Sequence, residues 1–219
     1  MLADFAAPKR NDVACDLGTG CGIIPLLWCR RSLENHITAV DIQQDAIDLL
    51  NRSCELNMLG ERVTPICADL RSFGSEMYGK FTLVTMNPPY KRLTGGLISP
   101  TDGRAIARHE VTCTVEDAVQ CASKLLKSGG RLVMCHRPER LADLICAMRS
   151  FSVEPKRLRF VCQREGSAPS LILCEGKKGA NPGMTVDAPF IIENGQSEYS
   201  DRMKEIYADY LAAKTEERQ

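Results

Sequence analysis

Four apolar runs in the N-terminal part of the chain each end in a polar side chain, with room for a helix between most of them. The runs are 13–17, 37–41, 63–67 and 81–86, and the polar residues at their ends are Asp16, Asp41, Asp69 and Asn87. Runs of this kind are typical of buried strands, and strands that alternate with helices form a parallel sheet. Because the carboxyl ends of parallel strands share one edge, we expect the four polar groups to lie side by side, where open α/β sheets bind ligands.

The rest of the pattern completes a Rossmann-like α/β fold. Three further strands are expected at 131–135, 156–161 and 170–174, and the last two form an antiparallel hairpin. We therefore expect a doubly wound, seven-stranded, mostly parallel sheet with one antiparallel strand. The 219 residues are expected to form a single domain 1–219, with a core over about 13–175 and a C-terminal tail and helix over 176–219. The abrupt start leads us to expect that an N-terminal element is missing.

Composition narrows the class of protein. Formal net charge is zero, and neither a signal peptide nor a membrane-spanning apolar run is present. The eleven cysteines are an odd number without a Cys-x-x-Cys pair, which favours free thiols in a reducing cytosol over disulfides or a structural zinc. From Lys124 to Arg164, ten Lys and Arg face three Asp and Glu. Such a stretch is usually a solvent-exposed surface. The more specific alternative is a basic footprint, meaning a surface that binds nucleic-acid phosphates.

A glycine-rich turn, Gly18-Thr19-Gly20-Cys21-Gly22, joins the first strand to an apolar helix. Glycines allow close approach of a ligand to the backbone, and the helix N-terminus lies beside it. The spacing is not the G-x-G-x-x-G of a dinucleotide site, and Asp16 would repel a pyrophosphate but suits a ligand with an ammonium and a sulfonium. Asp41 can accept ribose hydroxyls. Asp69 can accept an adenine amino hydrogen, although an Asp after a strand is often only a helix cap.

The motif Asn87-Pro88-Pro89-Tyr90 ends the fourth strand. Two consecutive prolines have no backbone N–H and a fixed φ, so the chain must leave the sheet in a stiff turn. The Asn87 side-chain oxygen and the Pro88 carbonyl can accept both hydrogens of a planar NH₂ group, while the Tyr90 ring stacks on its plane. The alternative reading is a simple strand-terminating turn. The polar, Gly-rich stretch 91–110 that follows, with His109, is read as a substrate-facing lid.

Taken together, these motifs resemble the class I S-adenosylmethionine-dependent methyltransferases that act on planar nitrogens. Within that group the chain is similar to the bacterial tRNA1(Val) (adenine-N6) methyltransferase family. The closer similarity rests on Leu2-Ala3-Asp4-Phe5, Ala107-Arg108-His109-Glu110, the segment Phe190-Ile191-Ile192 and Tyr199. That family normally begins with an additional segment ahead of Leu2. We expect part of the pocket for the methionine end of the cofactor to be missing together with that segment.

The resemblance implies a function for each motif residue. It implies S-adenosyl-L-methionine as cofactor and S-adenosyl-L-homocysteine as product. The implied partner is tRNA, with an adenine of the anticodon loop methylated in the cytoplasm and no metal or membrane involved. The implied cofactor-binding residues are Asp16, Gly18, Thr19, Gly20 and Gly22 on the methionine side, Asp41 and Ile42 at the ribose, Asp69 and Leu70 at the adenine, and Asn87. The implied catalytic residues are Asn87, Pro88, Pro89 and Tyr90.

Other functions share parts of this pattern. A glutamine-N5 methyltransferase acting on release factors uses the same four-residue turn, because a carboxamide has the same two hydrogens. A guanine-N2 rRNA methyltransferase is a second enzymatic alternative. An NAD-linked dehydrogenase conflicts with the glycine spacing. A catalytically silent binding module follows if the missing N-terminal part is needed to retain the cofactor.

Overall fold

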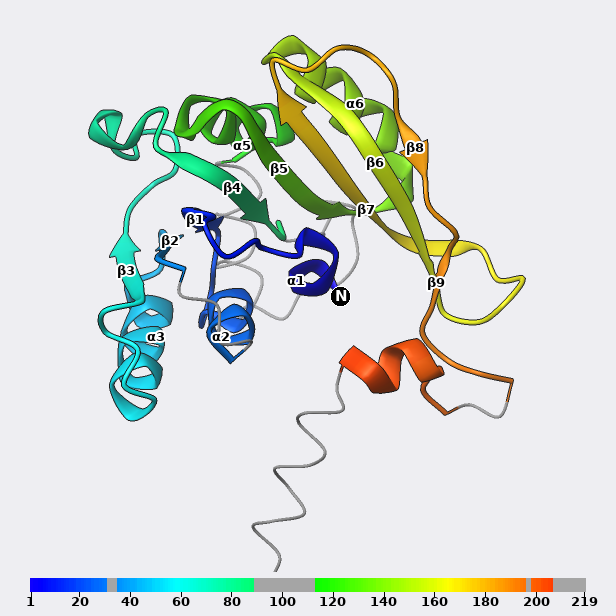
Figure 1. The fold of residues 1–219 in the computed structure, drawn as a ribbon, viewed down its shortest axis with the longest axis horizontal. Helices are drawn as coiled ribbons and strands as arrows, with labels where there is room; N and C mark the ends of the chain where they lie inside the picture. Colours follow the sequence, from blue (N-terminus) through cyan, green and yellow to red (C-terminus); the bar gives the residue numbers. More distant parts are fainter. Residues whose placement is uncertain (31–34, 89–112, 196–197, 207–219) are drawn as a thin grey trace, which may run out of the picture.

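The computed structural model describes residues 1–30, 35–88, 113–195 and 198–206. Its centre is a nine-stranded sheet with the strand order β3-β2-β1-β4-β5-β7-β6-β8, in which β9 also pairs with β6 (Figure 1). The strands are β1 (Ala14–Leu17), β2 (Ile37–Asp41), β3 (Val63–Cys67), β4 (Phe81–Met86), β5 (Leu126–His136), β6 (Val153–Cys162), β7 (Pro169–Lys178), β8 (Thr185–Val186) and β9 (Phe190–Ile191). Strands β1 to β5 run parallel to one another.

The predicted fold class is confirmed, and the predicted strand count is wrong by two. Only β7 is antiparallel to its neighbours β5 and β6, as the hairpin pattern indicated. The additional strands β8 and β9 have two residues each, too short for the residue pattern to show. They pair with the edge strand β6 and so cover it over part of its length. The segment Thr185–Ile191 is thereby part of the sheet rather than a free tail.

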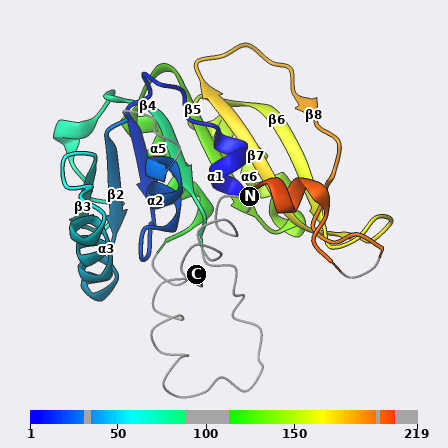
Figure 2. The same ribbon diagram turned by 60° about the horizontal axis from the view of Figure 1, so that its bottom comes forward.

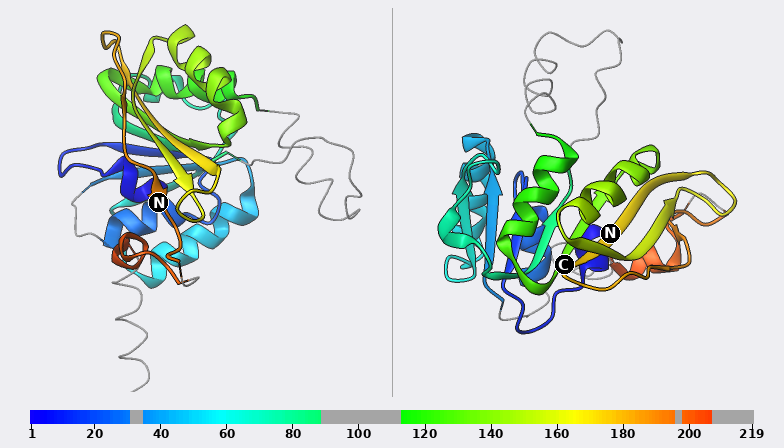
Figure 3. Two further views of the ribbon diagram at one scale, coloured as in Figure 1. Left: turned by 90° about the vertical axis from the view of Figure 1, so that its right-hand side faces the viewer. Right: turned by 90° about the horizontal axis from the view of Figure 1, so that it is seen from above.

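Helices cover both faces of the sheet (Figures 1 and 3). On one face lie α1 (Leu2–Ala6), α2 (Ile23–Arg30) and α3 (Gln44–Leu56), and on the other lie α5 (Val115–Leu125) and α6 (Leu141–Ser150). Two short 3₁₀ turns, η1 (Ser75–Met77) and η2 (Pro138–Arg140), precede β4 and α6. Neighbouring strand residues face opposite layers, since Ala14 belongs to the α1–α3 core and Cys15 to the α5–α6 core. Helix α5 begins with a capping box in which Thr114 and Asp117 bond to each other's backbone N–H groups.

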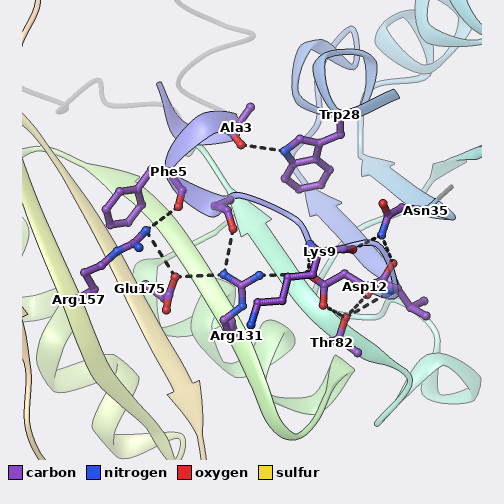
Figure 4. Close-up of polar contacts among 12 residues, drawn as sticks. Ala3, Phe5, Lys9, Asp12, Trp28, Asn35, Thr82, Arg131, Arg157 and Glu175 are labelled. Carbon is purple, nitrogen blue, oxygen red and sulfur yellow. Dashed lines mark hydrogen bonds and ion pairs between the residues drawn. The ribbon is translucent and has the colours of Figure 1, made fainter. Parts of the chain in front are cut away.

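The N-terminal helix α1 is fastened to the sheet through its backbone carbonyls (Figure 4). The guanidinium of Arg131 in β5 donates to Ala6 O (2.9 Å), and that of Arg157 in β6 donates to Phe5 O (2.6 Å). The indole of Trp28 in α2 donates to Ala3 O at 2.9 Å. The last carbonyls of a helix have no partner within it, so these donors satisfy groups that a five-residue helix leaves open. Helix α1 is held by tertiary contacts rather than by its own hydrogen bonds.

The C-terminal segment returns to the same region. Residues 201–206 are helical and lie beside α1, as Figure 2 shows. Arg202 pairs with Asp4 at 2.8 Å, and Met203 is buried in the core that contains Leu2 and Phe5. The two ends of the described chain therefore pack together on one face of the sheet. The remainder of the helix that was predicted beyond residue 206 lies outside the described residues.

Candidate functional site

The four polar strand ends meet at one edge of the sheet, as predicted. Leu17 of β1 is in register with Val40 of β2 and with Met86 of β4, and Asp41 is in register with Cys67 of β3. The residues that follow these strands consequently emerge side by side at the carboxyl edge. Gly18 lies next to Met86, since a Cβ on it would come within 4.0 Å of the Met86 Cε.

Asp41 organises the glycine turn. Its Oδ2 accepts a hydrogen bond from Gly20 N (2.8 Å), and its Oδ1 accepts one from Gln43 N (2.9 Å). The carboxylate is only 7% exposed, and each of its oxygens retains a second lone pair. Gly18 and Gly20 have φ values of +65° and +55°, a region that residues with a side chain rarely adopt. No atom of the described residues lies within 4 Å of the position that a Cβ on Gly20 would take, so this part of the structure leaves the backbone open to a ligand there.

The third glycine of the turn has a packing role. A Cβ on Gly22 would lie 2.2 Å from Leu50 Cδ1 of α3, and its φ is +83°. Gly22 therefore lets the turn and α2 pack against α3, whether or not its backbone also faces a ligand. Ile42, after β2, has 43% of its surface exposed at the same edge, where it is available to a ligand. Leu70, after β3, is half-buried against the α5–α6 core.

Asp16 is the buried carboxyl group of the site. It is 1% exposed, and its Oδ1 accepts a hydrogen bond from the Thr85 hydroxyl of β4 at 2.6 Å. Its Oδ2 and the Thr19 hydroxyl are buried and have no hydrogen-bond partner in the structure described here. Burial raises the pKa of Asp16 to about 7, against the lowering effects of the Thr85 hydroxyl and of the nearby Thr19 hydroxyl, which is not within hydrogen-bond geometry. A buried carboxylate oxygen without a donor is costly, so this position suits a ligand that supplies one, such as an ammonium group.

Asp69 carries an ion pair that the sequence did not indicate. The guanidinium of Arg71 contacts both of its carboxylate oxygens, and Arg71 N donates to Oδ1 at 2.9 Å. The carboxylate is 27% exposed, and Arg71 holds its pKa below the usual value. Asp69 therefore lies at the expected edge, but a local partner already engages it.

The predicted catalytic turn is only partly within the described residues. Asn87 is exposed and Pro88 is half-buried directly after β4, adjacent to the glycine turn. Pro89, Tyr90 and the predicted lid at 91–110 lie outside the described residues. The structure therefore brings Asp16, Gly18, Thr19, Gly20, Asp41, Ile42, Asp69, Leu70, Asn87 and Pro88 to one edge, with Gly22 behind them.

The predicted basic footprint is largely neutralised. Six of the seven arginines between Lys124 and Arg164 form ion pairs. Four of the acidic partners, Asp12, Glu175, Asp187 and Glu193, come from outside the stretch. The local excess of positive charge in the sequence is thus balanced by acids that the fold brings in. In the described structure these six arginines are paired with acids, so the excess of positive charge in this stretch of sequence does not by itself define a phosphate-binding face.

Three residues at this edge were not predicted from the sequence: Thr85, Arg71 and His136. Thr85 is a polar residue in an otherwise apolar run, directly in register with Asp16, and that interruption was a readable signal. His136 ends β5 at the same edge and is 8% exposed; its Nδ1 accepts a hydrogen bond from Arg137 N (2.8 Å), and burial lowers its pKa. Nothing in its sequence context marked it. Among the described residues, no cluster of His, Cys, Asp and Glu fit to bind a metal is found.

Similarity to known proteins agrees with this geometry. A family model for the methyltransferase small domain matches residues 1–145. The chain is 27% identical over 175 residues to the tRNA1(Val) (adenine(37)-N6)-methyltransferase of Parabacteroides distasonis. This alignment covers 80% of this chain and 73% of that protein. It is 26% identical over 212 residues to the protein of that name from Bacteroides thetaiotaomicron, and the alignment covers 96% of this chain and 86% of that protein. With that of Porphyromonas gingivalis it shares 28% over 163 residues, and the chain spans 63% of that relative.

Solved structures share the fold. A predicted O-methyltransferase from Agrobacterium tumefaciens superposes with a TM-score of 0.75 at 24% identity, covering 94% of this chain and 93% of that one. Geranyl diphosphate C-methyltransferase from Streptomyces coelicolor A3(2) superposes with a TM-score of 0.58 at 14% identity, and the superposition covers 80% of this chain and 79% of that one. At these identities the likeness concerns the fold alone. In the part of the chain that the structure describes, no helix is both long and apolar enough to cross a bilayer.

Proposed function

The chain belongs to the methyltransferase small domain family, and from this premise we propose that it methylates N6 of an adenine in tRNA. S-adenosyl-L-methionine is the methyl donor of the proposed reaction. The target is the adenine next to the anticodon, position 37 in the names of the relatives, and the reaction belongs in the cytoplasm. The carboxyl edge of the sheet supports this proposal most directly, because it combines an open glycine turn with a buried carboxylate oxygen that has no donor.

The residues at the edge fit the cofactor. When bound, S-adenosylmethionine supplies a methyl group made reactive by its attachment to a sulfonium. Asp16 Oδ2 and the Thr19 hydroxyl are buried polar atoms without partners in the described structure, and together they suit the amino acid end of the ligand. Asp41 has a free lone pair on each oxygen for the ribose hydroxyls. Asp69 and Leu70, which follow β3 at the same edge, are proposed to contact the adenine ring.

Asn87 and Pro88 are proposed to hold the target amine. The lone pair of an adenine N6 is delocalised into the ring, which makes the amine a poor nucleophile. Acceptance of its two hydrogens by the Asn87 side-chain oxygen and the Pro88 carbonyl concentrates the lone pair toward the methyl group. Tyr90, which follows in the sequence, is the expected stacking partner of the base. Stiff proline geometry favours positioning, an effect that supplies up to about 7–11 kcal/mol in well-oriented reactions.

The proposed reaction requires no dedicated general base. Transfer of the methyl group makes N6 cationic and acidic, so its proton is lost readily to solvent. The target base has to leave its stack before it can reach the edge of the sheet, and that step costs least in a single-stranded loop. An anticodon-loop adenine meets this requirement.

Methylation of defined transcripts tests the proposal. Purified protein is incubated with S-adenosylmethionine and a tRNA1(Val) transcript, and the digested nucleosides are analysed by mass spectrometry. We expect N6-methyladenosine with the adenosine-37 transcript and none when that adenosine is replaced by guanosine. Methylation of a glutamine-containing release-factor peptide, with none of the transcript, would overturn the proposal. Calorimetry with S-adenosylhomocysteine checks cofactor binding separately.

A further inference from the structure

Arg71 occupies the carboxylate that is proposed to receive the adenine amino group. Asp69 Oδ1 accepts hydrogen bonds from Arg71 N (2.9 Å) and Arg71 Nε (3.0 Å). Asp69 Oδ2 accepts from Arg71 Nε at 3.1 Å and from Arg71 Nη2. A carboxylate has about four lone-pair sites in total. Four contacts from a single residue therefore leave no ready position for another donor.

From this competition we propose that Arg71 is a gate on the adenine subsite of the cofactor, which rests on the proposed function. With the guanidinium on Asp69, the amino group of an entering adenine finds the carboxylate engaged. To bind, the ligand displaces the side chain of Arg71, while the backbone hydrogen bond from Arg71 N to Oδ1 remains. The side-chain ion pair therefore reduces the affinity for the cofactor, and its removal increases it.

Because both partners of the ion pair are partly exposed, its opening costs little free energy. The Arg71 side chain is 45% exposed and that of Asp69 is 27% exposed. An ion pair in this setting is weak, because water solvates both partners when they separate. Asp117, in the first turn of α5, is a second acid whose charge acts on the guanidinium. Asp69 and, to a lesser extent, Asp117 raise the pKa of Arg71, so the side chain lies within the field of both acids.

The gate also affects which bases are accepted. A 6-amino group donates to Asp69 and competes with Arg71 for the same oxygens. A 6-oxo group accepts hydrogen bonds, so it leaves the ion pair closed and can accept from the guanidinium. Arg71 therefore reduces the preference of the site for a 6-amino over a 6-oxo ligand.

Calorimetry on the full chain tests the gate with two probes, S-adenosylhomocysteine and its 6-oxo analogue S-inosylhomocysteine. Arg71→Met removes the guanidinium but keeps the backbone donor. We expect it to bind S-adenosylhomocysteine about two- to fivefold more tightly than wild type, the range set by an exposed ion pair. Binding of the 6-oxo analogue should not tighten. The matched control is Arg202→Met, which removes an arginine that is 53% exposed and paired with Asp4 and Glu205.

Two results would overturn the gate. If Arg71→Met bound S-adenosylhomocysteine equally well or more weakly, Arg71 would be holding Asp69 in place for the ligand rather than blocking it. If both ligands, or the Arg202→Met control, showed the same gain, a general effect of charge would explain it. Failure of the wild-type protein to bind S-adenosylhomocysteine would instead overturn the proposed function, and the gate with it.

Discussion

Two aspartates at opposite ends of strand β1 show how differently the two edges of the sheet are built. Asp12 and Asp16 each accept a hydrogen bond of 2.6 Å from a threonine of β4, Thr82 and Thr85 respectively. Asp12 also accepts from Lys9 N at 2.7 Å and from the guanidinium of Arg131 at 3.1 Å. Asp16 leaves one buried oxygen without any partner in the described structure.

The difference between the partners of Asp12 and those of Asp16 distinguishes an edge built for stability from an edge built for function. At the amino edge, the carboxylate of Asp12 is balanced by a cation and by backbone donors, and the surrounding contacts fasten α1 (Figure 4). At the carboxyl edge, burial without a cation raises the pKa of Asp16 to about 7. Unpaired buried groups destabilise a fold, and functional sites are where such groups are retained. The comparison indicates that changes at the amino edge should reduce stability, whereas changes at the carboxyl edge should reduce binding or catalysis.

The largest expected effect is on catalysis at the carboxyl edge. Asn87→Ala removes one of the two proposed acceptors of the target amine, and loss of one such group lowers the rate by about 100- to 1,000-fold. Asn87 is exposed, so the melting temperature and the affinity for S-adenosylhomocysteine should stay close to wild type. Single-turnover methylation of tRNA measures the rate. Activity within tenfold of wild type would remove Asn87 from its proposed role.

At the amino edge, the largest expected effect is on stability. Arg131→Ala leaves Asp12, Glu175 and the Ala6 carbonyl without their shared donor. The Arg131 side chain is 17% exposed, and loss of one partner from such a buried network costs about 3 kcal/mol. Urea unfolding measures this loss, with Arg140→Ala as the control because its pair with Asp143 is 42% and 50% exposed. A similar small loss for both variants would contradict the comparison.

Asp16→Asn should increase stability and weaken binding. The pKa of Asp16 is raised from 3.8 to about 7, so the folded state binds a proton that the unfolded state has lost. Stability is therefore lost as the pH rises from about 4 through 7. Asn removes this loss, and we expect a gain of about 4 kcal/mol at pH 8 and none at pH 4.

Thermal unfolding between pH 4 and pH 8 measures this gain, and calorimetry follows the accompanying loss of S-adenosylhomocysteine affinity. The matched control is Asp12→Asn at the other edge, which should destabilise at pH 8 because it weakens the pair with Arg131. Destabilisation by both substitutions at pH 8 would show that the carboxylate of Asp16 has hydrogen-bond or ion-pair partners as favourable as those of Asp12.

The smallest expected effects come from the two threonines. Thr82→Val removes a hydrogen bond to Asp12 and should cost about 1 kcal/mol at every pH between 6 and 9. Thr85→Val removes the hydrogen bond that lowers the pKa of Asp16, so that pKa should rise further. Loss of stability with rising pH should still begin near pH 4, but it should continue to a higher pH than in the wild type. Melting temperatures recorded against pH separate the two variants, and parallel curves would mean that the edges do not differ.

Much of the fold could be predicted from local patterns. The expected bounds of β2, β3 and β4 match the structure, because each is an apolar run bordered by turn residues. Strand β6 extends back past Pro155 to the buried Val153, and β7 continues through the mostly polar segment Glu175 to Lys178, so both strands are longer than expected. The two-residue strands β8 and β9 have no periodicity to read. Pattern reasoning finds strands that bury side chains, and it misses strands formed mainly by pairing.

The sequence by itself determined where the site lies, because a polar residue after a buried parallel strand must emerge at the carboxyl edge. It also determined the open glycine turn, since Gly18 and Gly20 permit a backbone that other residues resist. Only the tertiary structure decided which charges are paired. Arg131 meets the carbonyl of Ala6 across 125 residues, while none of the described residues supplies a cation to Asp16. Ion pairing depends on the register between distant strands, and no local pattern of residues encodes that register.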